Sequence, residues 1–316
     1  MIVKKAVITA GARGERLYPV ADTVQKSMLP MVDIDGINKP IIQIIAEEAL
    51  SSGVEEICIV CAPDDEIKYV ENFRSLQKTL ETSFKGAGWA QQQAANIKNL
   101  MDRLSFSVQA EPRGYGHAVY QARQFVNNEP FLLLLGDYLY VSDIKGKRCA
   151  RQLIELAVQE ECSVSAVNPT IEHQIGKYGT LTGKALLNYN GIYQIEKIIE
   201  KPSVSQAELE LQTPGLRAGY YLCFFGMHVF KPSVFDILKE TVEKQPANVL
   251  LTPALEEMAR TDKYLALEMK GNRYDTSKKL GLMLSQIALG LASDMRDEVL
   301  TQMVQILAET GKKVEL

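Results

Sequence analysis

The stretch AVITAGARGER, residues 6–16, decides the fold of this chain. It opens with an apolar run that is typical of a buried parallel strand. It then breaks at Gly11 and Gly14, which let the backbone turn tightly and approach a ligand closely. Consecutive backbone N–H groups in such a turn form a concave site for an anion, and Arg16 and Lys26 bring two cations to the same region. The stretch therefore predicts a strand that leads into a phosphate-binding loop.

Two well-known phosphate-binding loops do not match this stretch. A dinucleotide-binding loop requires G-x-G-x-x-G, and a P-loop requires G-x-x-x-x-G-K followed by Ser or Thr. Only Gly11 and Gly14 are present here. From the glycines and cations alone, an ordinary strand-to-helix turn with solvated side chains is the competing interpretation.

Composition sets the class of protein. The chain has 316 residues, is 46% apolar and 23% charged, and carries a net charge of −4. These values are ordinary for a globular protein, and the negative charge argues against a nucleic-acid partner. The longest apolar runs, such as Phe131–Leu135, are too short to cross a bilayer. No signal-peptide pattern opens the sequence and the five cysteines are odd in number, so we expect reduced thiols and a cytoplasmic protein.

Cys58 and Cys61 formally match the metal-binding and redox motif C-x-x-C. They lie inside the apolar run Ile57–Cys61, which is typical of a buried strand. Residues three apart in a strand face opposite sides, so the two thiols can neither chelate a metal together nor form a disulfide. We expect both cysteines to fill the core as small apolar residues.

Strand and helix patterns alternate along the first half of the chain, which predicts an α/β fold with a mixed, mostly parallel, Rossmann-like sheet flanked by helices. A smaller β-rich part follows. The expected strands are 6–10, 56–61, 106–109, 131–135, 163–167, 179–186, 191–199, 220–230 and 264–270. The expected helices are 40–52, 64–80, 89–104, 116–126, 146–160, 232–239, 280–291 and 298–308, with a loop or short helix over 206–215.

Two aspartates follow strands and are candidates for a divalent cation. Asp137 comes after the buried strand Phe131–Leu135 and Gly136, at the strand end where open parallel sheets bind ligands. Asp275 follows the last expected strand, in a segment that continues to Gly281. Mg²⁺ takes one or two carboxylates and fills its other positions with phosphate oxygens and water, so two acids suit it. Solvated loop acids are the alternative for both positions.

Three further segments carry polar groups that are candidates for ligand binding. Gln109 precedes the run Arg113–Ala118, and its amide offers a donor and an acceptor on one planar edge, as uracil and thymine do. Within the same run, His117 is expected to be structural at a helix start. Gly179 follows Lys-Tyr, and Glu200-Lys201 precedes a proline. Alternation along a strand places Glu200 and Lys201 on opposite sides unless the proline bends the chain.

These segments, in this order over residues 6–281, resemble those of the sugar-1-phosphate nucleotidylyltransferases. The nearest likeness is to the bacterial branch that couples UTP with glucose 1-phosphate. The resemblance implies in-line attack of the sugar phosphate on the α-phosphorus of UTP, giving UDP-glucose and pyrophosphate, with Mg²⁺ as cofactor. It implies that the nucleotide is bound by Ala10, Gly11, Gly14, Arg16, Lys26, Gln109 and Gly114. It implies that the sugar phosphate is bound by Gly179, Glu200 and Lys201, and that Mg²⁺ is bound by Asp137 and Asp275. The catalytic residues that it implies are Arg16, Lys26 and Lys201.

The resemblance leaves two alternatives open. Thymidylyl or another nucleotidyl transfer on the same scaffold is one, since uracil and thymine differ by one methyl group. A regulatory relative that binds nucleotide without chemistry is the other, because Ala12, Glu15 and Ser277 depart from the family pattern.

The resemblance also implies the organisation of the chain. We expect a catalytic domain over residues 1–281, with 1–140 mainly nucleotide-binding and 163–275 mainly sugar-binding. The C-terminal helices within 282–316 carry apolar residues at helical spacing. They are expected either to pack on the same chain or to join subunits, as a homodimer or homotetramer.

Overall fold

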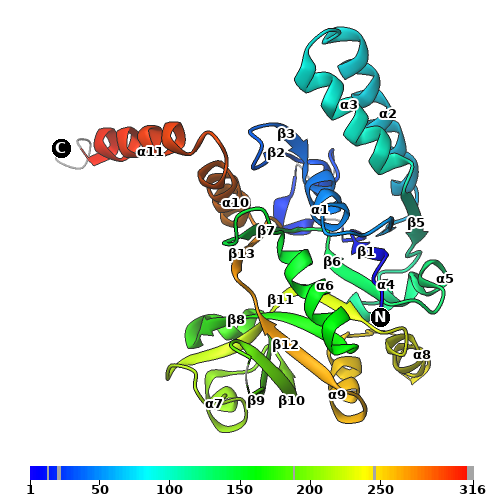
Figure 1. Ribbon diagram of the computed structural model, residues 1–316, viewed down its shortest axis with the longest axis vertical. Helices are drawn as coiled ribbons and strands as arrows, with labels where there is room; N and C mark the ends of the chain where they lie inside the picture. Colours follow the sequence, from blue (N-terminus) through cyan, green and yellow to red (C-terminus); the bar gives the residue numbers. More distant parts are fainter. Residues whose placement is uncertain (13, 20–22, 188, 245–246, 312–316) are drawn as a thin grey trace.

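The computed structural model describes residues 1–12, 14–19, 23–187, 189–244 and 247–311. Arg13 of the predicted phosphate loop lies outside these ranges. A nine-stranded mixed sheet runs through the described part of the chain in the order β5-β4-β1-β6-β11-β8-β12-β10-β9 (Figure 1). Its strands are β1 Lys5–Thr9, β4 Glu56–Cys61, β5 Leu104–Val108, β6 Phe131–Leu135, β8 Ser163–Ile171, β9 Gly179–Ala185, β10 Ile192–Glu200, β11 Tyr220–Phe230 and β12 Tyr264–Glu268.

The first half of the sheet is parallel. Strand β1 pairs in parallel with β4 on one side and β6 on the other, and β4 pairs in parallel with β5. Strand β6 is apolar throughout, β1 is apolar between Lys5 and Thr9, and both are almost wholly buried, as parallel strands covered on both faces require. The carboxyl ends of these strands therefore meet along one edge of the sheet.

The second half is mixed. Strand β11 runs antiparallel between β6 and β8, and β12 pairs in parallel with β8. The predicted hairpin is confirmed, with β9 antiparallel to β10. The predicted mixed α/β sheet is therefore confirmed, and most of its parallel pairs lie in the N-terminal half.

Helices cover both faces of the sheet. The hydrophobic cluster on one face includes side chains of α1, α2, α3 and α6. The cluster on the other face includes those of α4, α5, α8 and α9. The helices are α1 Ile41–Leu50, α2 Asp65–Ser83, α3 Gly88–Met101, α4 Tyr115–Gln121, α5 Arg123–Val126, α6 Cys149–Glu160, α7 Val204–Glu210, α8 Val234–Lys244, α9 Thr252–Thr261, α10 Lys279–Ala292 and α11 Arg296–Gly311. Among the described residues, the 3₁₀ helices η1 Glu15–Leu17 and η3 Lys26–Met28 precede α1, and η4 Glu172–Lys177 lies between β8 and β9.

Two small antiparallel ribbons were not predicted. Strand β7 (Tyr138–Ser142) pairs with β13 (Gly271–Asp275), and β2 (Pro30–Val32) pairs with β3 (Asn38–Pro40). The expectation that Asp275 follows the last strand was therefore wrong, because Asp275 is the final residue of β13. Five residues of mixed polarity give no strong strand signal, and only the pairing of distant segments reveals the ribbon.

Three further differences concern helices. The predicted helix 116–126 is two helices, because Ala122 ends α4 and precedes α5. Helix α7 occupies part of the polar stretch where a loop or short helix was expected. Helix α9 was not predicted, although Thr252-Pro253 is a typical helix start.

The cysteine prediction is confirmed: all five thiols are free and buried. Burial raises the pKa of Cys58 and of Cys61 to about 12, so both remain protonated at neutral pH. No helix in the described part of the chain combines the length and apolarity needed to cross a membrane.

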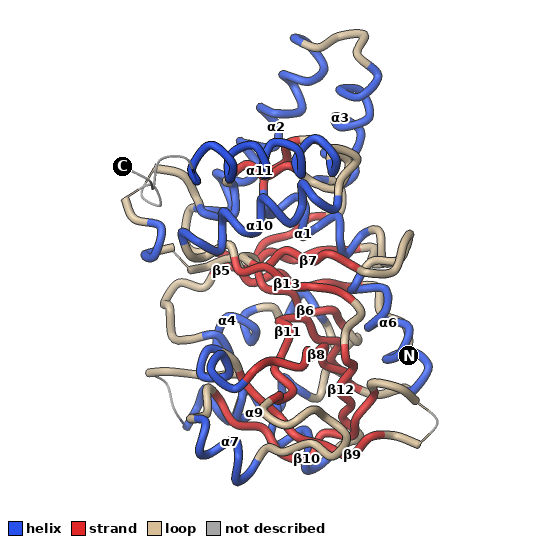
Figure 2. Tube along the Cα trace, turned by 90° about the vertical axis from the view of Figure 1, so that its left-hand side faces the viewer, coloured by secondary structure: helices blue, strands red, loops and turns tan. Residues whose placement is uncertain are grey.

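Two parts project from the body of the molecule. The α2–α3 pair extends from the β4–β5 edge, and α11 extends from α10 (Figure 1). Figure 2 shows α10 and α11 stacked beyond the β7–β13 ribbon, and α10 contacts both of its strands. The carboxyl ends of β1 and β6 lie at the edge of the sheet between the α2–α3 pair and α10 (Figure 1).

Candidate active site

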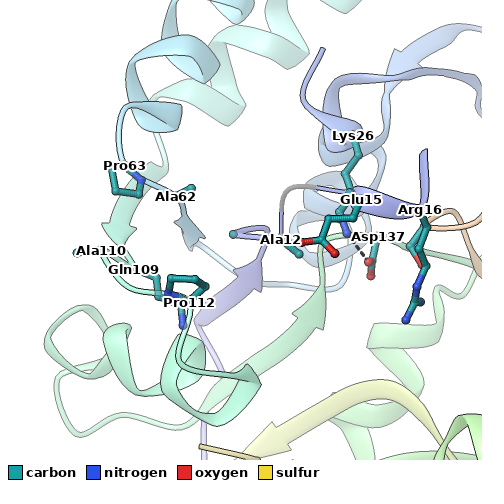
Figure 3. A pocket seen from close by; sticks show the side chains of 13 residues that line it. Ala12, Glu15, Arg16, Lys26, Ala62, Pro63, Gln109, Ala110, Pro112 and Asp137 are labelled. Carbon is teal, nitrogen blue, oxygen red and sulfur yellow. Dashed lines mark hydrogen bonds and ion pairs between the residues drawn. The ribbon is translucent and has the colours of Figure 1, made fainter. Parts of the chain in front are cut away.

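The loop after β1 forms one wall of a pocket of about 450 Å³ at the carboxyl edge of the sheet (Figure 3). Gly14 adopts φ 76° immediately before the short helix η1, a conformation that glycine reaches without strain. The lining residues come from five separate parts of the chain. They are Gly11, Ala12, Gly14, Glu15, Arg16, Lys26, Ala62, Pro63, Gln109, Ala110, Pro112, Asp137 and Ser277.

The pocket has two chemically different ends. Ala62, Pro63, Ala110 and Pro112 gather with Gln109 on one side in Figure 3, and they provide flat apolar surface beside one amide. The charged side chains of Glu15, Arg16, Lys26 and Asp137 gather on the other side. A nucleoside triphosphate has the same polarity, with a flat base at one end and a polyanion at the other.

Lys26 and Asp137 form the central ion pair of the charged end. Lys26 Nζ donates to Asp137 Oδ2 over 2.5 Å, and the Lys26 side chain is only 7% exposed. Gly136 places Asp137 by crossing the end of β1, where its N–H donates to Thr9 O. A Cβ on Gly136 would lie 2.6 Å from that oxygen, so a side chain cannot be accommodated there.

The structure brings the two predicted acids together. Asp275 pairs with Tyr138 in the β7–β13 ribbon, and Tyr138 directly follows Asp137. The N–H and hydroxyl of Thr276 both donate to Asp137 O, at 2.9 and 2.8 Å. The backbone of the second aspartate is thus tied to that of the first across the ribbon.

Each aspartate already has a cationic neighbour. Lys278 Nζ lies 3.1 Å from Asp275 Oδ2, and Lys26 Nζ lies 2.5 Å from Asp137 Oδ2. Burial tends to raise the pKa of Asp275, but hydrogen bonds from Ser277 and the charge of Lys278 hold it below its usual value. The carboxylate is therefore ionised at neutral pH, as a metal ligand must be.

The donor set suits a hard cation with few protein ligands. No group of three His, Cys, Asp or Glu side chains with metal-binding spacing occurs in the described part of the chain. Two aspartates whose backbones are neighbours, one of them on the wall of the first pocket, match the demands of Mg²⁺, which keeps water and phosphate oxygens in its remaining positions. They do not match those of structural zinc.

Gln109 lies at the apolar end, and its amide faces partly inward. Its Nε2 donates to Gly114 O over 3.2 Å and lies 3.0 Å from His117 Nδ1. The amide nitrogen thus has neighbours within the protein, and the expectation that Gln109 binds a base stays a prediction. His117 is confirmed as structural: it lies near the start of α4 and is buried against Gln109.

A second pocket, of about 280 Å³, lies beyond the β6–β7 turn. Glu200 contributes a carboxylate that accepts from the Thr252 hydroxyl over 2.7 Å. The lining residues are Tyr115, Leu135, Tyr138, Lys177, Tyr178, Gly179, Glu200, Lys201, Phe224, Gly226, His228, Leu250, Leu251, Thr252 and Leu255.

Glu200 and Lys201 both line this second pocket, against the expectation from strand alternation. Strand β10 ends at Glu200, and Lys201 adopts a left-handed backbone with φ 49°. This turn places Lys201 Nζ 3.4 Å from Glu200 Oε1. Gly179 faces the same carboxylate, since a Cβ there would lie 3.1 Å from Glu200 Oε2 and 2.8 Å from the Phe224 ring.

The structure does not gather every predicted residue into one cavity. Gly11, Gly14, Arg16, Lys26, Gln109 and Asp137 line the first pocket, whereas Gly179, Glu200 and Lys201 line the second. Ala10 lines a third hollow on the far side of Lys26. Gly114 lies behind Gln109 and packs against Val249, whose oxygen would be 2.6 Å from a Cβ.

Sequence reasoning missed several residues of the second pocket. Thr252 holds Glu200, and its helix-start signal Thr-Pro was available in the sequence. His228 lies in the middle of β11, and its ring bonds to Ser165 Oγ at 2.5 Å in the core. No local pattern indicates that position, because the pocket forms only when β11, β10 and α9 meet.

Comparison with known proteins identifies the class. The model of the nucleotidyl transferase family matches residues 5–279, and the chain belongs to this family. The expectation of a nucleotidyltransferase enzyme is confirmed.

Particular relatives are similar over almost their whole length. A UTP–glucose-1-phosphate uridylyltransferase of Streptococcus pneumoniae is 32% identical, over 98% of both chains. A solved UDP-glucose pyrophosphorylase complexed with UDP-glucose is 28% identical, with a TM-score of 0.72 over 91% of this chain and 98% of that one. A UTP-bound UDP-glucose pyrophosphorylase of Acinetobacter baumannii is 25% identical, with a TM-score of 0.76 over 96% and 99%.

Proposed function

We propose that this protein transfers a uridylyl group from UTP to glucose 1-phosphate, releasing pyrophosphate and forming UDP-glucose. The observation that carries the proposal is the pair of pockets on either side of the β6–β7 turn. The first has an amide beside apolar surface at one end and Lys26, Arg16 and Asp137 at the other. The second holds the Glu200 carboxylate, which can accept hydrogen bonds from sugar hydroxyls.

The reaction needs positioning and charge neutralisation more than proton transfer. The sugar phosphate is already ionised at neutral pH, so its oxygen can attack the α-phosphorus without a general base. Lys26 and Arg16 neutralise the triphosphate, and Lys201 at the mouth of the sugar pocket neutralises the sugar phosphate. Fixed cations that position the two polyanions and neutralise their charge provide the main contributions to catalysis of phosphoryl-group transfer.

Asp137 and Asp275 are the residues proposed to hold Mg²⁺. When bound, the ion would withdraw negative charge from the phosphate oxygens during transfer. Lys26 is the counter-ion of Asp137 without the metal, and it is free to turn to a phosphate once the carboxylate has another cation. The Asp137 carboxylate thus holds Lys26 when the metal is absent and would hold Mg²⁺ when it is bound.

An activity matrix tests the proposal. Pyrophosphate release is measured with UTP, dTTP, CTP, ATP and GTP, each against glucose, galactose and N-acetylglucosamine 1-phosphates, with Mg²⁺ present. We expect the highest kcat/KM with UTP and glucose 1-phosphate. Higher kcat/KM with dTTP would establish thymidylyl transfer instead, and nucleotide binding without pyrophosphate release would establish a non-catalytic relative.

Three further features belong to the same proposal. We propose that residues 1–281 form the catalytic unit, with 1–140 mainly nucleotide-binding and 163–275 mainly sugar-binding. We propose that the C-terminal helices within 282–316, which are α11 and most of α10, join subunits in a homodimer or homotetramer, because both expose apolar side chains. Five buried free thiols suit a reducing compartment, so we propose that the enzyme acts in the cytoplasm.

A further inference from the structure

Three polar side chains form a buried hydrogen-bond chain across the sheet. Ser165 on β8 lies between His228 on β11 and Tyr264 on β12, because β8 pairs with both of these strands. Ser165 Oγ is 2.5 Å from His228 Nδ1 and also bonds to the Tyr264 hydroxyl. Ser165 and Tyr264 are wholly buried, and His228 is 3% exposed. Bulk water therefore cannot satisfy the hydroxyls of Ser165 and Tyr264.

The hydrogen-bonding capacities of the three groups fix the direction of this chain. Each hydroxyl has one proton to donate, whereas imidazole Nδ1 either donates or accepts. Tyr264 has no hydrogen-bond partner other than Ser165 among the described residues, so its proton goes to Ser165 Oγ. Ser165 then donates its own proton to His228 Nδ1. In the opposite direction, the buried Tyr264 proton would have no acceptor, which is costly.

This direction assigns the tautomer of His228. Because Nδ1 accepts, the proton of the neutral ring lies on Nε2. Burial lowers the pKa of His228 to about 3, so the ring stays neutral at physiological pH. Its faces are held as well, since the ring stacks on Phe230 at 5.0 Å between centroids and lies 5.3 Å from the ring of Phe224. The imidazole therefore offers one fixed N–H donor.

The donor is directed toward the second pocket. His228 lines this pocket together with Phe224 and Gly226 of the same strand. Nδ1 is engaged by Ser165 inside the sheet, which leaves Nε2, across the ring, as the nitrogen for the cavity. Nε2 has no hydrogen-bond partner among the described residues, and it is not one of their wholly buried side-chain atoms that lack a partner. It is therefore open to the pocket and suited to a ligand oxygen.

The position of His228 indicates which part of a sugar phosphate it reaches. The side chain of Lys201, proposed to neutralise the phosphate, is 60% exposed at the mouth of the pocket, whereas His228 is 3% exposed on the surface of the sheet. A hexose 1-phosphate with its phosphate beside Lys201 directs its C3, C4 and C6 hydroxyls away from the mouth. Glu200 can only accept from hydroxyls, so His228 adds the complementary donor.

We propose that His228 determines sugar specificity by donating from Nε2–H to a hydroxyl on C3, C4 or C6 of the sugar. Ser165 and Tyr264 are positioning residues that fix this donor without contacting the sugar. The inference rests on the proposed function and deepens it, because it names the group that recognises the end of the sugar remote from the phosphate. A sugar without that hydroxyl leaves the N–H unpaired.

A set of deoxy sugars tests the proposal. kcat/KM is measured at saturating UTP for wild type and His228→Phe, with glucose 1-phosphate and its 2-, 3-, 4- and 6-deoxy analogues. In the wild type, removal of the hydroxyl that pairs with His228 should lower kcat/KM by about 10-fold or more, the size expected for a buried donor without an acceptor. In His228→Phe that loss should shrink to about 2-fold, and the KM for UTP should stay unchanged. The 2-deoxy analogue is the control, since its loss should be equal in both proteins.

A second variant separates recognition from folding. His228→Phe keeps the stack on Phe230 but leaves the Ser165 hydroxyl without an acceptor. The double variant Ser165→Ala/His228→Phe removes both groups and should show the same ranking of the analogues. A uniform fall in kcat/KM with every sugar, with the wild-type ranking retained in both variants, is what a purely structural role would give. That result would overturn the proposal.

Two measurements do not need turnover. Long-range ¹H–¹⁵N NMR of the wild type, which contains three histidines, reports the tautomer of the ring whose signals disappear in His228→Phe. An Nε2–H signal is expected, and an Nδ1–H signal would overturn the proposal. If the wild type releases no pyrophosphate with any nucleotide, the proposed function fails on its own. Calorimetric binding of glucose 1-phosphate and the same analogues to wild type and His228→Phe then decides the inference, which equal losses in the two proteins, or no binding, would refute.

Discussion

At the scale of single residues, the Lys26–Asp137 pair occupies the place where the two reactants would meet. Lys26 is nearly buried, and removing it leaves Asp137 without its cation. We expect Lys26→Ala to lower kcat by roughly 100-fold or more, the loss typical of one preorganised electrostatic contact. Asp137→Asn should have a similar effect at saturating Mg²⁺. The measurement is pyrophosphate release under saturating substrates.

Lys98→Ala is the matched control, because Lys98 on α3 forms an exposed pair with Asp102 just after that helix and lines neither pocket. Its turnover should equal that of the wild type. Unchanged turnover in Asp137→Asn would contradict the proposed metal site, and unchanged turnover in Lys26→Ala would contradict the role of the lysine.

His228 gives a prediction about acid stability. Burial lowers its pKa from 6.5 to about 3, so the folded protein keeps the ring neutral over most of the acid range. The unfolded chain binds a proton near pH 6.5, so the stability from this group is complete above that pH and decreases as the pH falls toward 3. The slope is about 1.4 kcal/mol per pH unit within that window.

Urea unfolding at several pH values between 7 and 4 measures this slope. His228→Phe keeps an aromatic ring beside Phe230, with which His228 stacks at 5.0 Å between ring centroids. The variant should lose stability less steeply than the wild type as the pH falls, whatever its stability at pH 7. Identical slopes in the two proteins would show that His228 is not the titrating group.

At the scale of elements, the start of helix α4 is held against the segment before α9. Gly116 N–H donates to Val249 O over 2.8 Å, and a Cβ on Gly116 would lie 2.6 Å from Leu250 O. Because the contact is with backbone, a neighbouring rotamer change cannot relieve it. The close approach positions the loop before α4, which carries Gln109, beside the helix that carries Thr252.

We expect Gly116→Ala to destabilise the protein by about 1–3 kcal/mol, the usual cost of forcing extra volume into a packed site. Gly88→Ala is the control, since Gly88 begins α3 and a Cβ there meets no atom within 4 Å. The control should be neutral or slightly stabilising. Thermal unfolding followed by circular dichroism compares the two, and equal melting temperatures would contradict the close approach.

At the scale of the whole molecule, the two C-terminal helices present apolar surface. Leu282 on α10 packs against the core. Other apolar side chains are exposed: Leu280, Met283 and Leu284 on α10, and Leu300, Val304 and Leu307 on α11. Residues three and four apart share a helix face, so each set forms a continuous strip. Contiguous exposed apolar surface of this kind is typical of an interface.

We expect Leu284→Glu combined with Leu307→Glu to lower the oligomeric state, because two buried charges oppose association. Light scattering coupled to size-exclusion chromatography gives the mass. Leu209→Glu is the control, since Leu209 is an isolated apolar residue, 85% exposed, on α7. A monomeric wild type at micromolar concentration would refute the proposed subunit contact.

The fold class was predictable from local sequence, and so were the residues proposed for the site. Buried parallel strands are continuous apolar runs, so β1, β4 and β6 could be read directly. A loop that carries Gly11, Gly14 and Arg16 after such a strand indicates a phosphate site, and an acid after a buried strand marks the edge where ligands bind. These signals lie within a few residues of one another, so no knowledge of long-range contacts was needed.

Other features had no local signal. The β7–β13 ribbon joins residues more than a hundred positions apart, and only that pairing brings Asp275 next to Asp137. The left-handed turn at Lys201 places its side chain beside Glu200, where simple strand alternation would place it on the opposite side.

The sequence by itself therefore determined which groups are candidates for the chemistry and where the sheet would place their strands, because hydrophobic periodicity and glycine turns are properties of adjacent residues. Only the tertiary structure decided that these groups form two pockets, which way each amide and carboxylate points, and which apolar strips stay exposed. Those properties depend on contacts between distant segments, and the orientation of a polar side chain is fixed by partners that the local sequence does not contain.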